Sequence, residues 1–257
     1  MEITLIPTLD VLRDIYRMPR DMARFQRYRR EMAAPDGTIL LPISGFNPMG
    51  HDHVAEALDH LLSIDAERVA ANAIADAASR LARVEGTYRV ALVLSDDIGG
   101  MWTERTNVEA TMRFRSTPRG GHGSSMAGWI IPILWTGDGS DAARVAIEVR
   151  AEIYRAVALL SVTETRTLDE IMRVEGRALR FGGASPVLNA ATIEAARASI
   201  APHRGSNAWP MIVAAMFGDE TASMYGYDAI GVPPRAGFDV ALADALAERE
   251  TPEAFVR

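Results

Sequence analysis

The sequence predicts a helix-rich α/β protein, with a small, partly parallel sheet of three or four strands and an N-terminal pair of helices. Short apolar runs alternate with longer segments of helical periodicity, and parallel strands need helical crossovers of this kind between them. The length of 257 residues is enough for one large core. We expect an N-terminal helical segment over 1–36, an α/β core over 37–184, and a C-terminal helical or irregular segment over 185–257 packed on the same domain.

The N-terminal region is expected to form two helices. Apolar residues recur at helical spacing between Thr8 and Arg17, and Thr8 can cap this helix. Pro19 interrupts the pattern, and a second helix is predicted from about Pro19 to Met32. The two segments together predict a helical hairpin or a kinked helix.

Three apolar runs are the predicted strands of the sheet. They are Ile39–Ile43, Val90–Leu94 and Trp129–Trp135, and small polar residues follow each of them. Pro132 lacks a backbone N–H, so the third run is expected to be an edge strand or a bulged strand. Residues 211–217 are apolar enough for a fourth strand, but their alanine content is equally compatible with a helix.

Helices are predicted in the segments that follow these runs. The first extends from about His53 to Arg83, with a candidate break at Ser63–Asp65, where either polar residue can begin a new helix. Thr167 and Glu170 have the spacing of a capping box. The other predicted helices begin at Trp102 or extend over Asp141–Leu160, Leu168–Phe181, Asn189–Ile200 and Phe238–Glu250.

The composition excludes several kinds of chemistry. All 27 basic residues are arginine, and cysteine is absent. Without lysine the chain cannot form a Schiff base, hold PLP in the usual way or complete a P-loop. Without cysteine it has no thiolate nucleophile, disulfide, cysteine-bound zinc or iron–sulfur cluster. No Gly-x-Gly-x-x-Gly or Gly-x-Ser-x-Gly motif follows a predicted strand, so dinucleotide binding and a serine hydrolase are poorly supported.

Charge and hydropathy limit the expected partners. The formal net charge of −7 argues against nucleic acid, because its binding depends on broad phosphate neutralisation. No apolar stretch approaches the roughly 18 to 20 residues that cross a bilayer, so no membrane partner is expected. Met1–Asp10 has no basic region ahead of a long apolar segment and does not resemble a secretory signal. A cytoplasmic location is the default expectation.

The histidines give the strongest chemical signal. Three of the five, His51, His53 and His60, fall within ten residues at the start of a predicted helix. His53 and His60 would lie two turns, about 10 Å, apart along that helix and could not easily share one ion. Their spacing also differs from the metalloprotease motif, in which two histidines are four residues apart. A helix-capping or solvent-exposed role, a metal site and metal-free acid–base chemistry all remain open.

Candidate ligands are expected at the ends of the predicted strands. If the three runs are adjacent parallel strands, their carboxyl ends bring His51 and His53, then Asp96 and Asp97, then Asp138, to the edge where open α/β sheets bind ligands. Imidazole and carboxylate groups together can bind zinc, iron or manganese. His51, His53 and Asp96 are therefore the candidate ligands of a divalent metal ion.

Asp97, Arg105 and His122 are the candidate catalytic residues. Arg105 would position an anionic group of a substrate, and His122, in a glycine-rich loop, would close over the site as a lid residue. Asp97 would act beside the metal ion. The alternatives are a turn or a helix cap for Asp97, and surface positions for Arg105 and His122.

These observations predict a metal-assisted enzyme, a hydrolase or a lyase, that acts on a small polar or anionic substrate at the carboxyl edge of the sheet. The alternative is a non-catalytic binding or assembly protein that uses its helical N-terminus and its aromatic-rich C-terminal segment. The enzyme needs a concave pocket with clustered His and Asp, whereas the binding protein needs an exposed apolar patch near one terminus. A homo-oligomer is compatible with either function.

Overall fold

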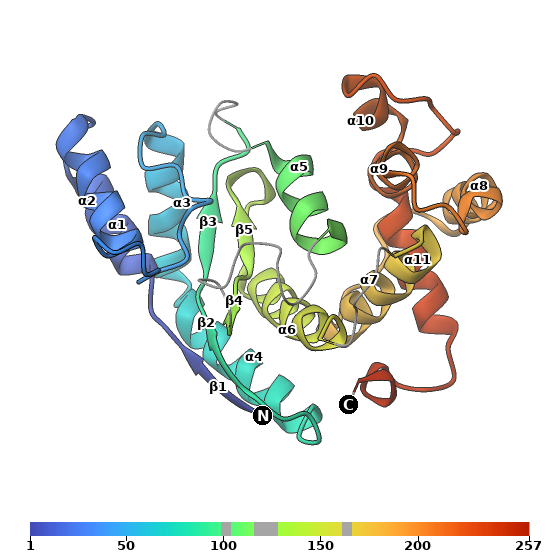
Figure 1. Ribbon diagram of the computed structural model, residues 1–257, viewed down its shortest axis with the longest axis horizontal. Helices are drawn as coiled ribbons and strands as arrows, with labels where there is room; N and C mark the ends of the chain where they lie inside the picture. Colours follow the sequence, from blue (N-terminus) through green and yellow to red (C-terminus); the bar gives the residue numbers. More distant parts are fainter. Residues whose placement is uncertain (99–103, 116–127, 161–165, 257) are drawn as a thin grey trace. The chain divides into compact units, whose positions relative to one another are not determined.

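A computed structural model of the protein describes residues 1–98, 104–115, 128–160 and 166–256 (Figure 1). These residues form a helix-rich α/β structure, as predicted, with a small parallel sheet and a separate pair of parallel strands. The chain divides into two compact units. As far as the structure describes those ranges, the first comprises Met1–Arg105 and His122–Ile153, and the second comprises Thr106–Gly121 and Tyr154–Val256.

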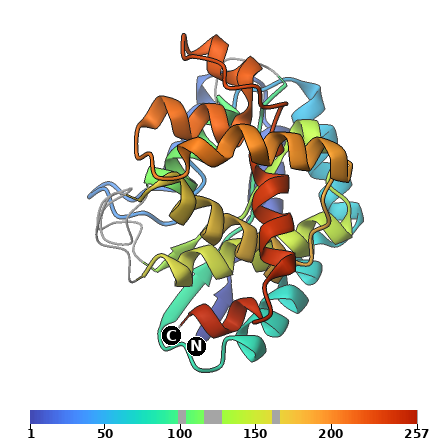
Figure 2. The ribbon, with the colours of Figure 1, turned by 90° about the vertical axis from the view of Figure 1, so that its right-hand side faces the viewer.

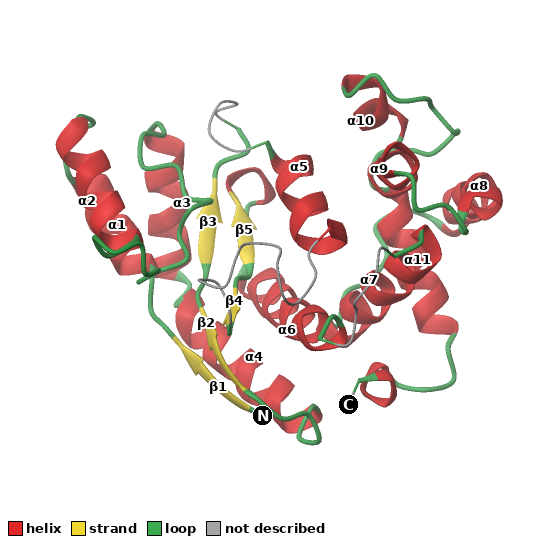
Figure 3. Cartoon of the chain, in the orientation of Figure 1, coloured by secondary structure: helices red, strands yellow, loops and turns green. Residues whose placement is uncertain are grey.

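The strands of the first unit are short and parallel (Figure 3). Three of them pair in the order β1, β2, β4, and β3 pairs separately with β5. The predicted run Val90–Leu94 overlaps the end of β2 and most of β3, and the run Trp129–Trp135 contains β4 and β5, so these two runs are adjacent and parallel. The strands are β1 Glu2–Leu5, β2 Thr87–Val90, β3 Val93–Ser95, β4 Trp129–Ile130 and β5 Ile133–Trp135.

Both runs are interrupted in the middle, and Pro132 stands at one of the two interruptions. Proline can accept a ladder hydrogen bond but cannot donate one. Its carbonyl accepts from the N–H of Val93 at 3.1 Å, so backbone pairing continues past the interruption. The last residues of β3 and β5 are register partners. The segments that begin at Asp96 and at Thr136 are therefore neighbours.

The prediction of a strand over Ile39–Ile43 is wrong. The run forms only an isolated antiparallel bridge between Ile39 and Ala33. Pro42, the fourth of its five residues, has no backbone N–H to donate, which prevents a regular ladder there. The third strand of the sheet is instead β1, which was not predicted. Its four residues are too few for their periodicity to distinguish a strand from an extended loop.

The helices of the first unit follow the predicted segments (Figure 1). The N-terminal pair of helices is confirmed, and the candidate break at Ser63–Asp65 separates α3 from α4. α1 packs against α3, and α4 packs on β1. The predicted helix start at Trp102 lies outside the described residues. The helices are α1 Leu9–Arg17, α2 Met22–Met32, α3 Asp52–Ser63, α4 Ala66–Arg80, α5 Arg105–Ala110 and α6 Ala142–Ala158. Of these, α5 and α6 have residues in both units.

A side chain of α4 caps the first residues of α1. Thr8 occupies the predicted N-cap position, but its hydroxyl donates to the carbonyl of Leu92 at 2.5 Å instead of capping the helix. One carboxylate oxygen of Glu67 accepts hydrogen bonds from the backbone N–H groups of Thr8 at 2.6 Å and Leu9 at 2.9 Å. An anion at this end also interacts favourably with the helix dipole. Glu67 therefore connects α4 to the start of α1.

Glu67→Ala is expected to lower the free energy of unfolding by about 1–2 kcal/mol, because two backbone donors lose a charged acceptor. Chemical denaturation followed by circular dichroism measures this change. Asp76→Ala is the control, since Asp76 is an exposed carboxylate on the same helix and its ion pairs are on the surface. Equal losses in the two variants would show that Glu67 does not cap α1.

The described part of the second unit is helical (Figure 2). α11 packs against α7, α8 and α9 around a shared apolar core. Thr167 and Glu170 form the predicted capping box, in which each side chain accepts from the backbone N–H of the other, at 3.4 and 2.7 Å respectively. Residues 211–217 lie within α9, so the helix alternative is correct, with Pro210 in the first turn where its missing N–H costs nothing.

The other predicted helices of this unit agree with the structure to within a few residues. These are α7 Leu168–Gly182, α8 Ala190–Ile200 and α11 Ala236–Ala247. α9 extends over Trp209–Phe217, and α10, which was not predicted, extends over Asp219–Met224. Shorter helical segments are the π-helix Thr111–Arg115 and the 3₁₀ helices Thr136–Asp138, Ala201–His203 and Pro252–Phe255. The π-helix and the last two 3₁₀ helices belong to the second unit, and Thr136–Asp138 belongs to the first.

Two adjacent residues of α7 are fully enclosed in the core of the second unit. A Cβ atom on Gly176 would lie 2.0 Å from the carbonyl oxygen of Ala241, so α7 and α11 approach closely at this glycine. Glu175 is 0% exposed, and both of its carboxylate oxygens accept from Nε of Arg155, at 3.0 and 3.1 Å. Arg155 is itself 2% exposed, so the unit contains a buried ion pair.

Candidate functional site

Asp96 is the centre of a buried polar cluster at the carboxyl end of β3. Its side chain is 2% exposed. The carboxylate accepts hydrogen bonds from Nδ2 of Asn47 at 3.0 Å, the ring of His53 at 2.8 Å and the backbone N–H of Ile98 at 3.1 Å. A buried carboxylate is costly unless donors replace its water, and these groups replace it. The cluster joins the loop before α3, α3 itself and the segment after β3.

His53 is the second residue of α3 and contacts Asp96 through Nε2. An ionised carboxylate can only accept, so Nε2 carries the proton in this contact. In the neutral ring, Nδ1 is then the unprotonated nitrogen with a lone pair. The side chain is 26% exposed, so part of the ring remains accessible. Asp96 thus fixes both the tautomer and the orientation of the imidazole.

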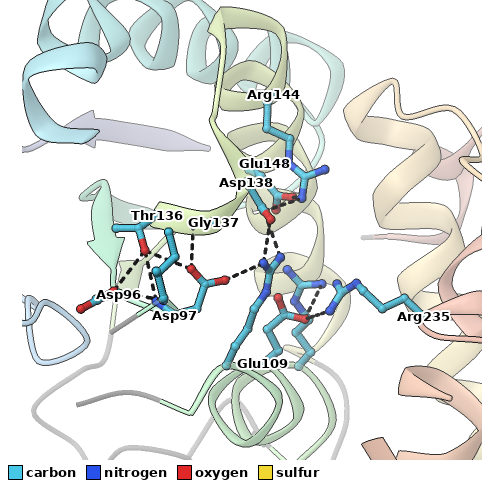
Figure 4. A network of polar contacts seen from close by, with 12 residues as sticks. Asp96, Asp97, Glu109, Thr136, Gly137, Asp138, Arg144, Glu148 and Arg235 are labelled. Atoms are coloured by element: carbon cyan, nitrogen blue, oxygen red, sulfur yellow. Dashed lines mark hydrogen bonds and ion pairs between the residues drawn. The ribbon is translucent and has the colours of Figure 1, made fainter. Parts of the chain in front are cut away.

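Asp97 belongs to a neighbouring set of charged contacts (Figure 4). Its carboxylate accepts from the backbone N–H of Gly137 at 2.8 Å and from Nη1 of Arg105 at 2.9 Å. Arg105 also donates to Asp138 through both terminal nitrogens, at 2.6 and 2.9 Å. Arg144 continues the network with a 3.3 Å contact to Asp138. Arg105 is therefore held between two carboxylates.

Thr136 lies between Asp96 and Asp97 (Figure 4). Its hydroxyl oxygen is 3.2 Å from Oδ1 of Asp96 and 3.0 Å from Oδ1 of Asp97. The same oxygen accepts from the backbone N–H of Asp97 at 3.2 Å. One side chain from the end of β5 thus contacts both carboxylates at the end of β3.

Sequence reasoning missed Asn47 and Thr136, and it also missed Tyr16, which positions Asn47. The hydroxyl of Tyr16 donates to the carbonyl of Asn47 at 2.5 Å, and the side-chain oxygen of Asn47 accepts from the N–H of Met49 at 3.0 Å. Burial raises the pKa of Tyr16 above its ordinary range, so the phenol stays a donor. Their position in the sequence could have identified Asn47 and Thr136, because both follow predicted strand runs, as most of the candidate residues do.

The structure brings four of the six candidate residues into two contacting pairs. His53 contacts Asp96, and Arg105 contacts Asp97. Thr136 contacts the carboxylate of each pair.

The other two candidate residues are not placed with them. His51 is exposed, and its Nδ1 lies 3.4 Å from Nη1 of Arg20. His122 lies outside the described residues. Within the ranges that the structure describes, no group of three or more His, Asp or Glu side chains has an arrangement that could hold a metal ion.

A cavity of about 270 Å³ lies beside this cluster in the first unit. α3 contributes His53, Glu56 and His60 to its wall, and the chain around β5 contributes Trp135 and Ser140. Nε2 of His60 lies 3.1 Å from the carbonyl oxygen of Ser140, which holds the second histidine against the opposite wall. Two imidazoles from one helix therefore line the same cavity.

Two further findings bear on the class of protein. None of the helices in the described ranges combines the length and the apolar composition of a membrane span. No family model, no curated protein and no solved structure matches this chain.

Proposed function

We propose that the first unit carries the acid–base site of an enzyme, a hydrolase or a lyase, that acts on a small polar substrate. His53 exchanges a proton with the substrate or with water in the cavity, and Asp96 holds its ring. The observation that supports this function is the 2.8 Å contact between Nε2 of His53 and the 2% exposed carboxylate of Asp96, on a residue that lines a cavity.

The chemistry follows from the two protonation states of the imidazole. Neutral His53 donates its Nε2 proton to Asp96 and uses the lone pair of Nδ1 to take a proton. The imidazolium that forms lies against a carboxylate that water does not solvate, so the ion pair stabilises the new charge. The same ring can then return the proton to a leaving group. A hydrolase takes the proton from water, and a lyase takes it from the substrate.

The contacts that the candidate metal ligands already make favour an enzyme that works without a metal ion. Asp96 already accepts from Asn47 and His53, and His51 lies against the cationic Arg20. A zinc, iron or manganese ion held by His51, His53 and Asp96 would have to displace these contacts. It remains the alternative form of the proposal. The role of Arg105 in holding an anion also remains a prediction, since its guanidinium contacts Asp97 and Asp138.

His53→Gln is expected to lower the rate of p-nitrophenyl acetate hydrolysis on the order of 10²-fold, because a general base contributes 10²–10⁴-fold. Asp96→Asn should cause a similar loss, since the amide no longer stabilises the imidazolium. His51→Gln is the matched control and should keep the wild-type rate. Two-dimensional NMR of the histidine ring nitrogens should show the Nε2–H tautomer at His53 in the wild type and lose it in Asp96→Asn.

The same assay separates the competing functions. If added zinc, iron or manganese raised the rate and a chelator abolished it, the metal-assisted form would replace the metal-free one. If the His53→Gln and Asp96→Asn variants both kept the wild-type rate, the acid–base function would be wrong. The binding or assembly alternative would then be favoured by Met224 and Tyr225 in the C-terminal segment, which are 79% and 39% exposed. A cytoplasmic location and a homo-oligomer remain predictions.

A further inference from the structure

We propose that the cavity beside His53 takes a small aliphatic ligand with a positively charged amino group. This inference builds on the proposed function, because it names the substrate class of the same cavity. The evidence for it is the charge and the hydrogen-bonding groups of the cavity wall and the volume of the cavity.

Histidines aside, Glu56 is the one acidic or basic residue in the cavity wall among the residues that the structure describes. It lies three residues after His53 and four before His60, so all three share a face of α3. The arginines that contact Asp97 and Asp138 do not offset this charge. Arg105 is paired with those two carboxylates, and Arg144 is paired with Asp138 and, at 3.0 Å, with Glu148.

The two histidines add hydrogen-bond acceptors to the carboxylate. Nε2 of His53 faces Asp96 and Nε2 of His60 faces the carbonyl of Ser140, so both neutral rings carry their proton on Nε2. Each ring then keeps one nitrogen with a lone pair. α3 therefore contributes to the cavity wall two imidazoles, each with one acceptor nitrogen, and one carboxylate. An ammonium group, with three donors and one positive charge, complements such a wall, whereas a carboxylate or phosphate would be repelled by Glu56.

The rest of the wall fixes the size and polarity of the remaining part of the ligand. Ala57, Leu61, Leu94 and Ile98 present an apolar surface next to the polar face of α3. The volume of about 270 Å³ is slightly below the roughly 300–1,000 Å³ of sites for drug-sized molecules. A short alkyl chain that carries the amino group satisfies both conditions.

Three probes of the same shape test the proposal. The ¹⁵N-labelled full-length protein is titrated with n-butylammonium, n-butanol and butyrate at a pH of about 8, above the ordinary pKa of histidine. The indole N–H signal of Trp135 and the amide signals of α3 report binding in the cavity. We expect butylammonium to bind about tenfold more tightly than butanol, which is a difference of about 1.4 kcal/mol, and butyrate to bind most weakly.

Variants that remove a carboxylate show whether Glu56 causes the preference for butylammonium. Glu56→Gln should reduce the preference for butylammonium over butanol to less than about twofold, a difference of less than about 0.4 kcal/mol. Glu85→Gln is the matched control, because Glu85 is an exposed residue that does not line the cavity. It should leave the preference unchanged. Circular dichroism of both variants checks that they are folded.

The proposal is overturned if butyrate binds as tightly as butylammonium, if Glu56→Gln keeps the preference, or if none of the three probes shifts the signals. These outcomes are distinct from the failure of the acid–base function. A cavity that prefers the cation, combined with full activity of His53→Gln, would leave an amine-binding site without the proposed catalysis. A loss of activity in His53→Gln, combined with tight butyrate binding, would leave an acid–base enzyme with a different substrate class.

Discussion

Glu175→Ala is expected to lower the free energy of unfolding of the second unit by about 3–5 kcal/mol. The substitution removes both acceptors of Nε of Arg155, whose side chain is 2% exposed. The buried guanidinium then loses a carboxylate that compensates its charge and cannot recover water at that position. The loss is measured by denaturant unfolding followed by circular dichroism at neutral pH.

A surface ion pair of the same unit provides the matched control. Glu194 pairs with Arg197 and is 67% exposed, so Glu194→Ala should change stability by less than about 1 kcal/mol. The double variant Arg155→Met with Glu175→Leu should recover most of the loss, because apolar residues of similar volume often replace a buried pair without cost. Equal losses of stability in Glu175→Ala and Glu194→Ala would show that burial of the ion pair does not determine the loss.

Gly176→Ala is expected to destabilise the second unit by about 3 kcal/mol, at the upper end of the usual cost of overpacking. The new Cβ atom would lie 2.0 Å from the carbonyl oxygen and 2.6 Å from the carbonyl carbon of Ala241. Both are backbone atoms, so rotation of a side chain cannot relieve the contact, and α7 and α11 must separate. Thermal unfolding should show a lower midpoint and a less cooperative transition.

Gly205→Ala is the control for this substitution. A Cβ atom at Gly205 would have no heavy atom within 4 Å among the described residues. The change should therefore be neutral or should stabilise the protein by a few tenths of a kcal/mol, since it reduces the freedom of the unfolded chain. If Gly176→Ala behaved in the same way, the close approach of the two helices would be wrong.

The fold could be predicted where a local pattern identifies its own hydrogen bonds. The capping box of Thr167 and Glu170 is such a pattern, because spacing and residue type specify both contacts. An apolar run carries less information. Ile43 is 0% exposed although it belongs to no strand, so its run correctly indicated burial but not backbone pairing. β1 illustrates the opposite case, since its pairing depends on residues more than eighty positions away.

The candidate site could be predicted only in part, because its geometry depends on loops. The predicted proximity of His53 and Asp96 depended on a strand over Ile39–Ile43, yet the two residues are in contact without that strand. The loop itself provides the connection, since Ser95 donates to the carbonyl of Gly45 at 2.7 Å. Asn47 could not be predicted as a partner of Asp96, because no periodicity specifies which loop side chain faces inward.

Because Thr136 contacts both carboxylates, Asp96 and Asp97 compete for one hydrogen-bond donor. A hydroxyl group has one hydrogen, so it can donate to Asp96 or to Asp97 but not fully to both at the same time. The hydroxyl therefore links the carboxylate that holds His53 to the carboxylate that binds Arg105, and the orientation of its single hydrogen decides which of the two keeps this donor.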